Sequence, residues 1–97
     1  MQFDGFDWDE GNRLKCRQHG VSVEEIESLF GRPALVGPDA AHSSVERRYR
    51  AMGRTAAGRF VFLVFTWRDR KGLRLIRPIS ARYMHAKEVA SYGEKIP

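Results

Sequence analysis

The sequence contains little of what marks several common protein classes. Its 97 residues include a single cysteine, Cys16, so an internal disulfide cannot form. No cysteine or histidine cluster has the spacing of a zinc site, and no run approaches the ~20 apolar residues needed to span a bilayer. The first residues lack the basic and apolar regions of a signal peptide. We therefore expect no metal site or cofactor, a protein that is neither secreted nor membrane-spanning, and a cytoplasmic location.

The signatures of several enzyme classes are also missing. The chain has no glycine-rich phosphate-binding loop, no cluster of carboxylates for two metal ions and no nucleophile elbow of the G-x-S-x-G type. It is long enough for one hydrophobic core and too short for two, and it shows no internal repeat or linker. Residues 1–97 are therefore expected to form a single domain.

The charged residues are distributed unevenly along the chain. Residues 1–39 contain four basic and eight acidic side chains, whereas residues 40–97 contain thirteen basic and four acidic ones. Ten of these thirteen are arginines, and the net charge changes from −4 in the first segment to +9 in the second. Because arginine binds phosphate with a planar pair of donors, nucleic acid is the first partner to consider.

Two helices are expected in the acidic segment. Asp9 can cap a helix over residues 10–19, which has few apolar positions and ends at Gly20. Ser22 and Glu25 have the spacing of a capping box that begins a second helix. The apolar side chains of this second helix recur at helical spacing and predict that it packs on the core; they are Val23, Ile26, Leu29 and Phe30.

The rest of the chain has the patterns of a β-sheet followed by a helix. A segment over residues 3–8 is predicted to be an edge strand or an aromatic-anchored arm, and a short strand is predicted at residues 34–36. Further strands are expected at residues 45–54, 60–67 and 73–80, with turns at 54–58 and 68–72.

The details of these segments predict their places in the sheet. The apolar run at residues 60–67 predicts a central strand, and Pro78 predicts an edge position or a bulge in the last one. Ser80 is expected to cap a final helix, with Arg82 just inside its N-terminus. The fold class is therefore α+β, with a small antiparallel sheet, two N-terminal helices and one C-terminal helix.

Three blocks of sequence, in this order, resemble the BrnT family of bacterial type II toxins. The blocks are Phe6-Asp7-Trp8-Asp9 leading to His19-Gly20-Val21-Ser22 and Glu24-Glu25; Arg50-Ala51-Met52-Gly53-Arg54-Thr55 followed by Gly58-Arg59; and Ile79-Ser80-Ala81-Arg82 before a helix with Glu88 and Tyr92. Together they span nearly the whole chain. The family commonly has Asn four residues and Lys one residue before its His, where this chain has Lys15 and Gln18, and Asn12 stands about one turn earlier.

The resemblance implies a RelE-like fold and a function. The function is that of a toxin, an endoribonuclease that cleaves RNA. The implied partner is a cognate antitoxin, in that family a BrnA-like ribbon-helix-helix protein, and the resemblance allows a toxin–antitoxin hetero-oligomer.

Metal-free cleavage of RNA requires three tasks of the protein. The 2′-hydroxyl must lose a proton, the charge of the phosphorane must be stabilised and the leaving 5′-oxygen must gain a proton. His19 has a side chain suited to proton transfer, with Lys15 one helical turn before it. Glu46 is a candidate base, or an arginine's partner in a cross-strand ion pair. The candidate catalytic set is completed by Arg59, Arg77 and Arg82. The candidate RNA-binding arginines are Arg48, Arg50, Arg54 and Arg74.

These residues also have structural interpretations. Alternating arginines are commonly a solvated face of a strand, and a histidine before a C-cap glycine favourably meets the helix dipole. Arg82 can pair with Glu88, whereas Arg59 and Arg77 are expected to be exposed groups at strand ends. Cys16 is expected to be a packed thiol. His42 and His85 are expected at the surface.

The aromatic residues divide into two groups. The apolar run predicts a place in the core for Phe60, Phe62, Phe65 and Trp67. Trp8 and Tyr83 are candidates for stacking on a base or for binding the antitoxin. For the whole chain, the alternatives to a ribonuclease are a non-catalytic nucleic-acid-binding module and an antitoxin-binding module that uses the same basic face.

Overall fold

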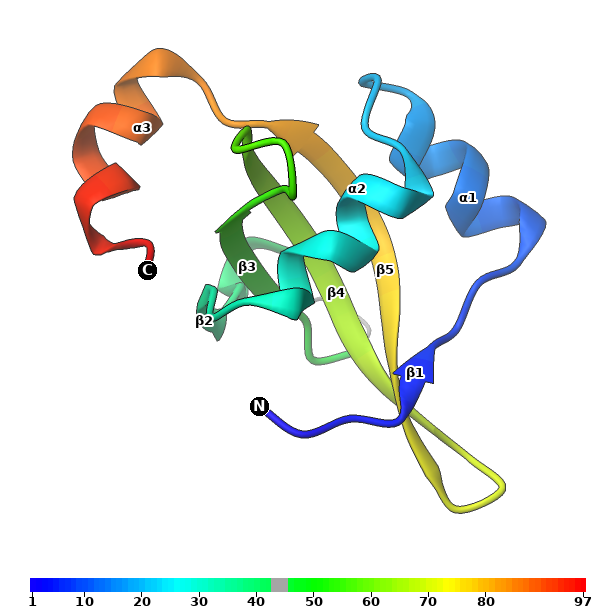
Figure 1. The fold of residues 1–97 in the computed structure, drawn as a ribbon. Helices are drawn as coiled ribbons and strands as arrows, with labels where there is room; N and C mark the ends of the chain where they lie inside the picture. Colours follow the sequence, from blue (N-terminus) through cyan, green and yellow to red (C-terminus); the bar gives the residue numbers. More distant parts are fainter. Residues whose placement is uncertain (43–45) are drawn as a thin grey trace.

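One sheet organises the computed structural model, which describes residues 1–42 and 46–97 (Figure 1). Its strands lie in the order β1-β5-β4-β3-β2, and only β1 and β5 run parallel. The described elements are β1 (Gly5–Phe6), α1 (Glu10–Arg17), α2 (Val23–Ser28), β2 (Leu35–Pro38), β3 (Tyr49–Arg54), β4 (Phe60–Arg70), β5 (Leu73–Tyr83) and α3 (Ala86–Tyr92). Short 3-10 turns lie after α2 at Leu29–Gly31, after β2 at Ala40–His42 and after α3 at Gly93–Lys95. The expected α+β class and the order of its elements are confirmed.

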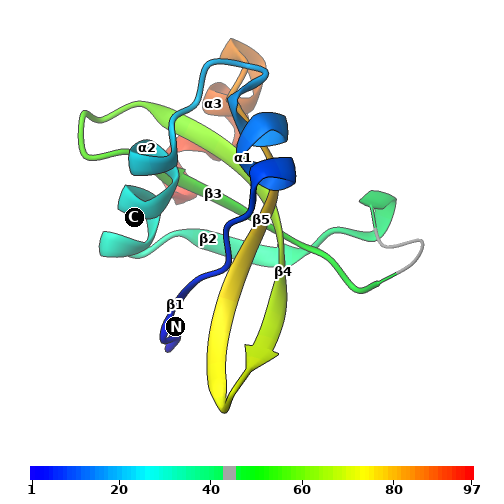
Figure 2. The same ribbon diagram turned by 90° about the vertical axis from the view of Figure 1, so that its right-hand side faces the viewer.

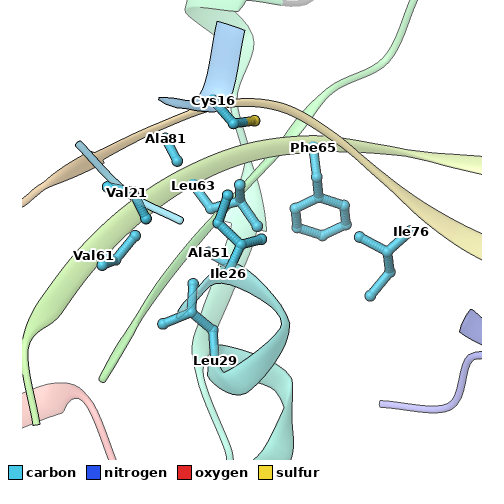
Figure 3. Close-up of a cluster of buried hydrophobic side chains, with 10 residues drawn as sticks. All are labelled: Cys16, Val21, Ile26, Leu29, Ala51, Val61, Leu63, Phe65, Ile76 and Ala81. Carbon is cyan, nitrogen blue, oxygen red and sulfur yellow. The ribbon is translucent and has the colours of Figure 1, made fainter. Parts of the chain in front are cut away.

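Helices α1 and α2 lie against one face of the sheet, which we call the helix face (Figures 1 and 2). The main core lies between them and the strands. Its buried side chains, shown in Figure 3, are Cys16, Val21, Ile26, Leu29, Ala51, Val61, Leu63, Phe65, Ile76 and Ala81. Because side chains alternate along a strand, the odd-numbered residues of β3 and of β4 up to Phe65 face this core.

The second face of the sheet has a smaller apolar cluster and is partly covered by α3. Met52, Met84 and Ile96 are buried there, and the half-buried residues packed against them come from the strands and from α3. Three rows of paired residues define this face. The rows are Arg50, Val64 and Ser80; Met52, Phe62 and Arg82; and Arg54 with Phe60. α3 therefore covers one end of a face that also carries arginines.

Local sequence signals account for the first helices. Asp9 and Asn12 form a capping box at the start of α1, and Ser22 and Glu25 form another at the start of α2. Gly20 has a φ of +87°, a conformation that glycine adopts without strain. The predicted N-caps Asp9 and Ser22 are confirmed, but α1 ends at Arg17 with Gln18 as its C-cap, before His19 and the predicted C-cap Gly20.

The strands β3, β4 and β5 differ in length from their predicted bounds. β4 is central, as expected, but it continues to Arg70, so the turn predicted at 68–72 is shorter. β3 begins at Tyr49, so the strand predicted at residues 45–54 is wrong for residues 46–48, which are described and are not in a strand; Val45 lies outside the described residues. The β3–β4 hairpin is confirmed, with Gly58 at a φ of +87°.

The last strand corrects one prediction. Ser80 and Arg82 belong to β5 and pair with β4, so Ser80 does not cap a helix and Arg82 does not lie in one. α3 begins only at Ala86, after His85 as its N-cap. Continued pairing with the long strand β4 keeps the backbone extended to Tyr83.

Pro78 lies next to an irregularity in the β4–β5 register, as its missing N–H predicted. Phe65 is opposite Pro78 and Val64 is opposite Ser80, which leaves Ile79 as the extra residue. The buried amide of Asn12 donates to the Pro78 carbonyl at 2.8 Å and to the Asp7 carbonyl at 3.0 Å. Asn12 thus joins α1 to the bulge of β5. Among the described residues, no helix is long and apolar enough to cross a membrane.

Candidate functional site

A pocket of about 270 Å³ lies where the turn after α1 meets β4 and β5. Its apolar lining comes mainly from Phe62 and Val64, and its polar lining comes from His19, Ser80 and Arg82. The volume is just below the ~300–1,000 Å³ of typical small-molecule sites. A hollow of this size, with His19 and Arg82 in its lining, suits a part of a larger ligand, such as one phosphate and its neighbours in a chain.

Arg82 is held in place by Glu88, by the Phe62 ring and by a backbone carbonyl. Its Nη1 and Nη2 donate to Glu88 Oε1 and Oε2 at 2.6 and 2.9 Å, and its Cζ lies 4.7 Å from the centre of the Phe62 ring. The hydrogen bonds with Glu88 raise the pKa of Arg82, while those from Arg82 lower the pKa of Glu88 to about 2. Nη1 also lies 3.4 Å from the Tyr83 carbonyl, so two of its five N–H donors are without a partner among the described residues. The pair with Glu88 that the sequence suggested is confirmed.

Arg50, like Arg54 on the same face, has no ion pair with any described residue. It is half-buried on β3 opposite Val64, in the row that continues to Ser80. Within residues 1–42 and 46–97, no hydrogen bond, ion pair or ring contact of its side chain is present. From strand spacing and rise, its Cα lies about 12 Å from that of Arg82. Two long side chains at this separation can reach the same phosphate.

Arg54 and Arg59 flank the β3–β4 hairpin but lie on opposite faces of the sheet. Arg54 is on the second face, with its Cζ 4.7 Å from the centre of the Phe60 ring. Arg59 is exposed on the side of the helix face, with its Cζ 3.5 Å from the centre of the Tyr83 ring. The two arginines cannot bind one phosphate together, whereas Arg50, Arg54 and Arg82 share a face.

Tyr83 is anchored to the start of α2. Its hydroxyl donates to the Glu25 carboxylate, whose oxygens lie at 2.8 and 2.9 Å, and lies 3.3 Å from the Gly20 carbonyl. Burial and the Glu25 carboxylate raise the pKa of Tyr83. Burial works against ionisation of Glu25, but hydrogen bonds from the Ser22 backbone and from Tyr83 prevail and lower its pKa. The hydroxyl is therefore a fixed hydrogen-bond donor.

Lys15 and Arg77 line a neighbouring hollow between α1 and β5, together with Asp9, Asn12 and Ile79. Arg77 is only 18% exposed and binds Asp9 at 2.8 Å and Asp7 at 3.5 Å. The expectation of an exposed strand-end group is therefore wrong for Arg77, which lies mid-strand and pairs with the N-terminal segment. The Asn12 backbone and the Arg77 side chain both lower the pKa of Asp9. Lys15 itself is exposed on α1.

Three other candidates lie away from the pocket. Glu46 binds Arg68 at 2.9 Å and lies 3.7 Å from Arg48, which is the ion-pair role that the sequence offered as an alternative. Arg74 is exposed near the β4–β5 turn, with its Cζ 3.9 Å from the centre of the Trp67 ring. The β4–β5 turn projects at the end of the sheet opposite α3 (Figure 1).

The pocket residues that the sequence did not assign to a site lie on β4 and β5. Phe62 was assigned only to the core, and Ser80 only to a helix cap. Extending the strand alternation of residues 73–80 by three positions places Ser80 and Arg82 on one face. Cys16 is a packed thiol as predicted, since it is fully buried and burial raises its pKa to about 11.

The donor set around the pocket is cationic and neutral rather than acidic. Within the described parts of the chain, no three His, Cys, Asp or Glu side chains come together as ligands for a metal ion. The chemistry available to the pocket residues is proton transfer by the His19 imidazole, hydrogen bonding by the Ser80 hydroxyl and charge stabilisation by guanidinium groups.

A comparison with known families identifies a family of ribonucleases. Residues 8–88 match a family described as ribonuclease toxin, BrnT, of type II toxin-antitoxin system. The matched range includes α1, α2, the strands from β2 to β5 and the start of α3 with Glu88. A search of curated proteins found no match. The match confirms the family that the three sequence blocks resemble.

Proposed function

The chain belongs to the BrnT family of type II ribonuclease toxins, and we propose that it cleaves RNA without a metal ion at the pocket of His19 and Arg82. A ribonuclease toxin of a type II system acts on RNA and has a protein antitoxin as partner. The observation that carries the proposal is the placement of one imidazole and one oriented guanidinium around the same hollow. Arg50, which has no described counter-charge, lies across β4 from Ser80, in the same row of residues.

The chemistry begins at the ribose 2′-hydroxyl. Neutral His19 accepts its proton, and the oxygen attacks the adjacent phosphorus. The bond from phosphorus to the 5′-oxygen of the next nucleotide breaks, which leaves a 2′,3′-cyclic phosphate. The departing 5′-oxygen takes a proton, so the atoms balance without a metal-bound water. Lys15, on the helix before His19, carries an ammonium group that can donate this proton.

Arginine side chains stabilise the charge that grows on the phosphorane. Glu88 orients Arg82 and neutralises part of its charge, so Arg82 serves mainly as a directed hydrogen-bond donor. Arg50 has no described counter-ion and supplies the net positive charge. Arg54 extends the basic surface along the same face and is assigned to RNA binding.

The other candidates receive different roles in this proposal. Arg59 is assigned to binding the RNA beside the pocket. Arg77 and Glu46 are engaged by neighbouring charged residues, and we leave them out of the reacting centre. Arg48 and Arg74 lie toward the other end of the sheet and are retained only as sites for a longer RNA.

The proposal is tested by incubating RNA with the purified protein in excess EDTA. We expect cleavage by the wild type, and a loss of about 100-fold or more in His19→Ala, since general acid–base groups contribute about 10²–10⁴-fold. Gln18→Ala is the matched control, because Gln18 is exposed in the same turn. Tight binding of RNA that stays intact would favour a non-catalytic binding module. Equal cleavage by His19→Ala would remove His19 from the mechanism.

The antitoxin is proposed to be a BrnA-like ribbon-helix-helix protein that forms a hetero-oligomer with the toxin. This identity rests on the family resemblance of the three sequence blocks. A short ribbon-helix-helix reading frame beside the gene, whose product co-purifies with the toxin and stops RNA cleavage, is the expected result. A neighbouring product of another fold with the same effect would correct the antitoxin class and leave the ribonuclease proposal intact.

A further inference from the structure

We infer that Arg59 and Tyr83 form a stacking subsite for an unpaired base of the RNA, beside the cleavage pocket. This inference rests on the proposed function. The Arg59 guanidinium carbon lies 3.5 Å from the centre of the Tyr83 ring, which is the shortest such distance among the described arginine–aromatic pairs. Arg59 is exposed and Tyr83 is half-buried. The ring thus supports a planar cation at the protein surface.

The support beneath Arg59 is rigid. The Tyr83 hydroxyl donates to Glu25, and the Glu25 carboxylate in turn accepts from the Ser22 backbone N–H at 3.0 Å. This last bond belongs to the capping box of α2. The ring is therefore tied to a helix end on one side and to β5 on the other. The ring that supports Arg59 therefore has little conformational freedom left to lose when a base stacks on the guanidinium.

The local charge favours a base over a phosphate. Tyr83 contacts both the Glu25 carboxylate and the Arg59 guanidinium, and these two opposite charges interact electrostatically, so the net charge of the cluster is close to zero. Arg50, in contrast, has no described counter-charge. A partly neutralised, planar guanidinium still has a flat face that stacks on an aromatic ring. Unpaired RNA bases are recognised in this way, by stacking on aromatic rings and arginine planes.

The position of the cluster connects it to the cleavage pocket. The Tyr83 hydroxyl lies 3.3 Å from the carbonyl of Gly20, the residue that follows His19. Arg82, the neighbour of Tyr83 in β5, lines the pocket itself. Because neighbouring strand residues point to opposite faces, an RNA that runs from Arg82 to Arg59 must pass around the end of β5 at His19. A base next to the scissile bond is therefore the base that reaches the stack.

Binding of an RNA that cannot be cleaved tests the subsite. Oligonucleotides with 2′-O-methyl groups lack the attacking hydroxyl, and fluorescent 2-aminopurine is placed at successive positions. We expect quenching at one position when the wild type binds, and a Kd about tenfold weaker when that base is replaced by an abasic site. Arg59→Lys keeps the positive charge and removes the planar guanidinium group. It is expected to lose the quenching and the abasic penalty while the salt dependence of Kd stays the same.

Arg13→Lys is the matched control, because Arg13 is exposed on α1 and its Cζ lies 5.9 Å from the centre of the Trp8 ring, farther than the 3.5 Å between Arg59 and Tyr83. It should behave as the wild type. The subsite is overturned if Arg59→Lys retains both the quenching and the abasic penalty in a protein that still cleaves RNA. A wild type that neither binds nor cleaves RNA would instead overturn the proposed function, and the subsite with it.

Discussion

Arg82 at the end of β5 and Glu88 in α3 are joined by two parallel hydrogen bonds of 2.6 and 2.9 Å. Glu88 Oε1 also accepts from the His85 backbone N–H at 2.8 Å, which closes the first turn of α3. One carboxylate therefore orients an arginine of the candidate site and fixes the start of the helix that covers part of the same face. We therefore expect Glu88 to contribute both to the stability of the fold and to the activity of the candidate site.

Replacing Glu88 with Gln should weaken folding in a pH-dependent way. The folded-state pKa of Glu88 is about 2, against an ordinary value of 4.5. Its ionised form therefore adds stability that is fully present above pH 4.5 and is lost as the pH falls toward 2. We expect Glu88→Gln to lower the free energy of unfolding by about 2 kcal/mol at pH 7, allowing for screening of a partly exposed pair.

Urea denaturation at a series of pH values measures this difference. The two proteins should converge in stability toward pH 2. Glu94→Gln, which removes an exposed carboxylate from the turn after α3, is the control and should follow the wild type. A constant gap between wild type and Glu88→Gln from pH 7 to pH 2 would show that the ionised pair is not the cause.

Truncating Arg50 should reduce cleavage with little effect on folding. Its side chain has no partner among the described residues, so its loss leaves no buried group unpaired. We expect Arg50→Ala to lower the single-turnover rate in EDTA about 10- to 100-fold and to change the thermal midpoint little. Arg32→Ala removes an exposed arginine outside the site and should keep the wild-type rate. Equal losses in both variants would point to a general charge effect.

Asn12 is expected to be a structural residue whose removal destabilises the fold. Its amide donates to the Asp7 and Pro78 carbonyls, and its Oδ1 accepts from the Asp9 N–H at 2.7 Å. Asn12→Ala should lower the free energy of unfolding by about 2–3 kcal/mol, because buried groups lose their partners. Urea denaturation at neutral pH checks this. Asn12→Asp should cost more, since it places a carboxylate near two carbonyls, and a stable Asp variant would refute the assigned contacts.

Arg77 should act mainly through the N-terminal segment. It binds Asp7 and Asp9, and the Asp7 N–H donates to the Ile76 carbonyl of β5 at 2.8 Å. We expect Arg77→Ala to reduce the hydrogen-exchange protection of the Asp7 amide about tenfold, through local opening of β1. Amides of β4 serve as the internal control and should be unaffected. If the Asp7 amide keeps its protection while RNA cleavage is lost, Arg77 acts directly in the reaction and not through the N-terminal segment.

Local signals explain why much of the fold could be predicted from the sequence. The capping boxes of Asp9 and Ser22, the turn glycine Gly58 and the bulge at Pro78 each depend on neighbouring residues alone. The end of β5 depends instead on pairing with β4, that is, on residues about twenty positions earlier in the sequence, such as Val61 opposite Tyr83. Ser80 has the side chain of a good helix cap, but its partner across the sheet, Val64, decides its conformation.

The sequence predicted several residues of the candidate site but not how they are arranged in space. Arg82 and His19 follow from the three sequence blocks, and the structure places both at one pocket. That Arg54 and Arg59 lie on opposite faces depends on the hairpin register, because a shift by one residue inverts every side chain. Arg77 is a similar case, since its partners Asp7 and Asp9 are about 70 residues away in sequence and no local pattern connects them.

The ends of the RNA products formed in EDTA test the central claim most directly. Attack by the 2′-hydroxyl at the pocket of His19 and Arg82 predicts a 2′,3′-cyclic phosphate on one fragment and a 5′-hydroxyl on the other, with both products lost together in His19→Ala. Intact RNA, or fragments that carry a 3′-hydroxyl and a 5′-phosphate, would contradict the account.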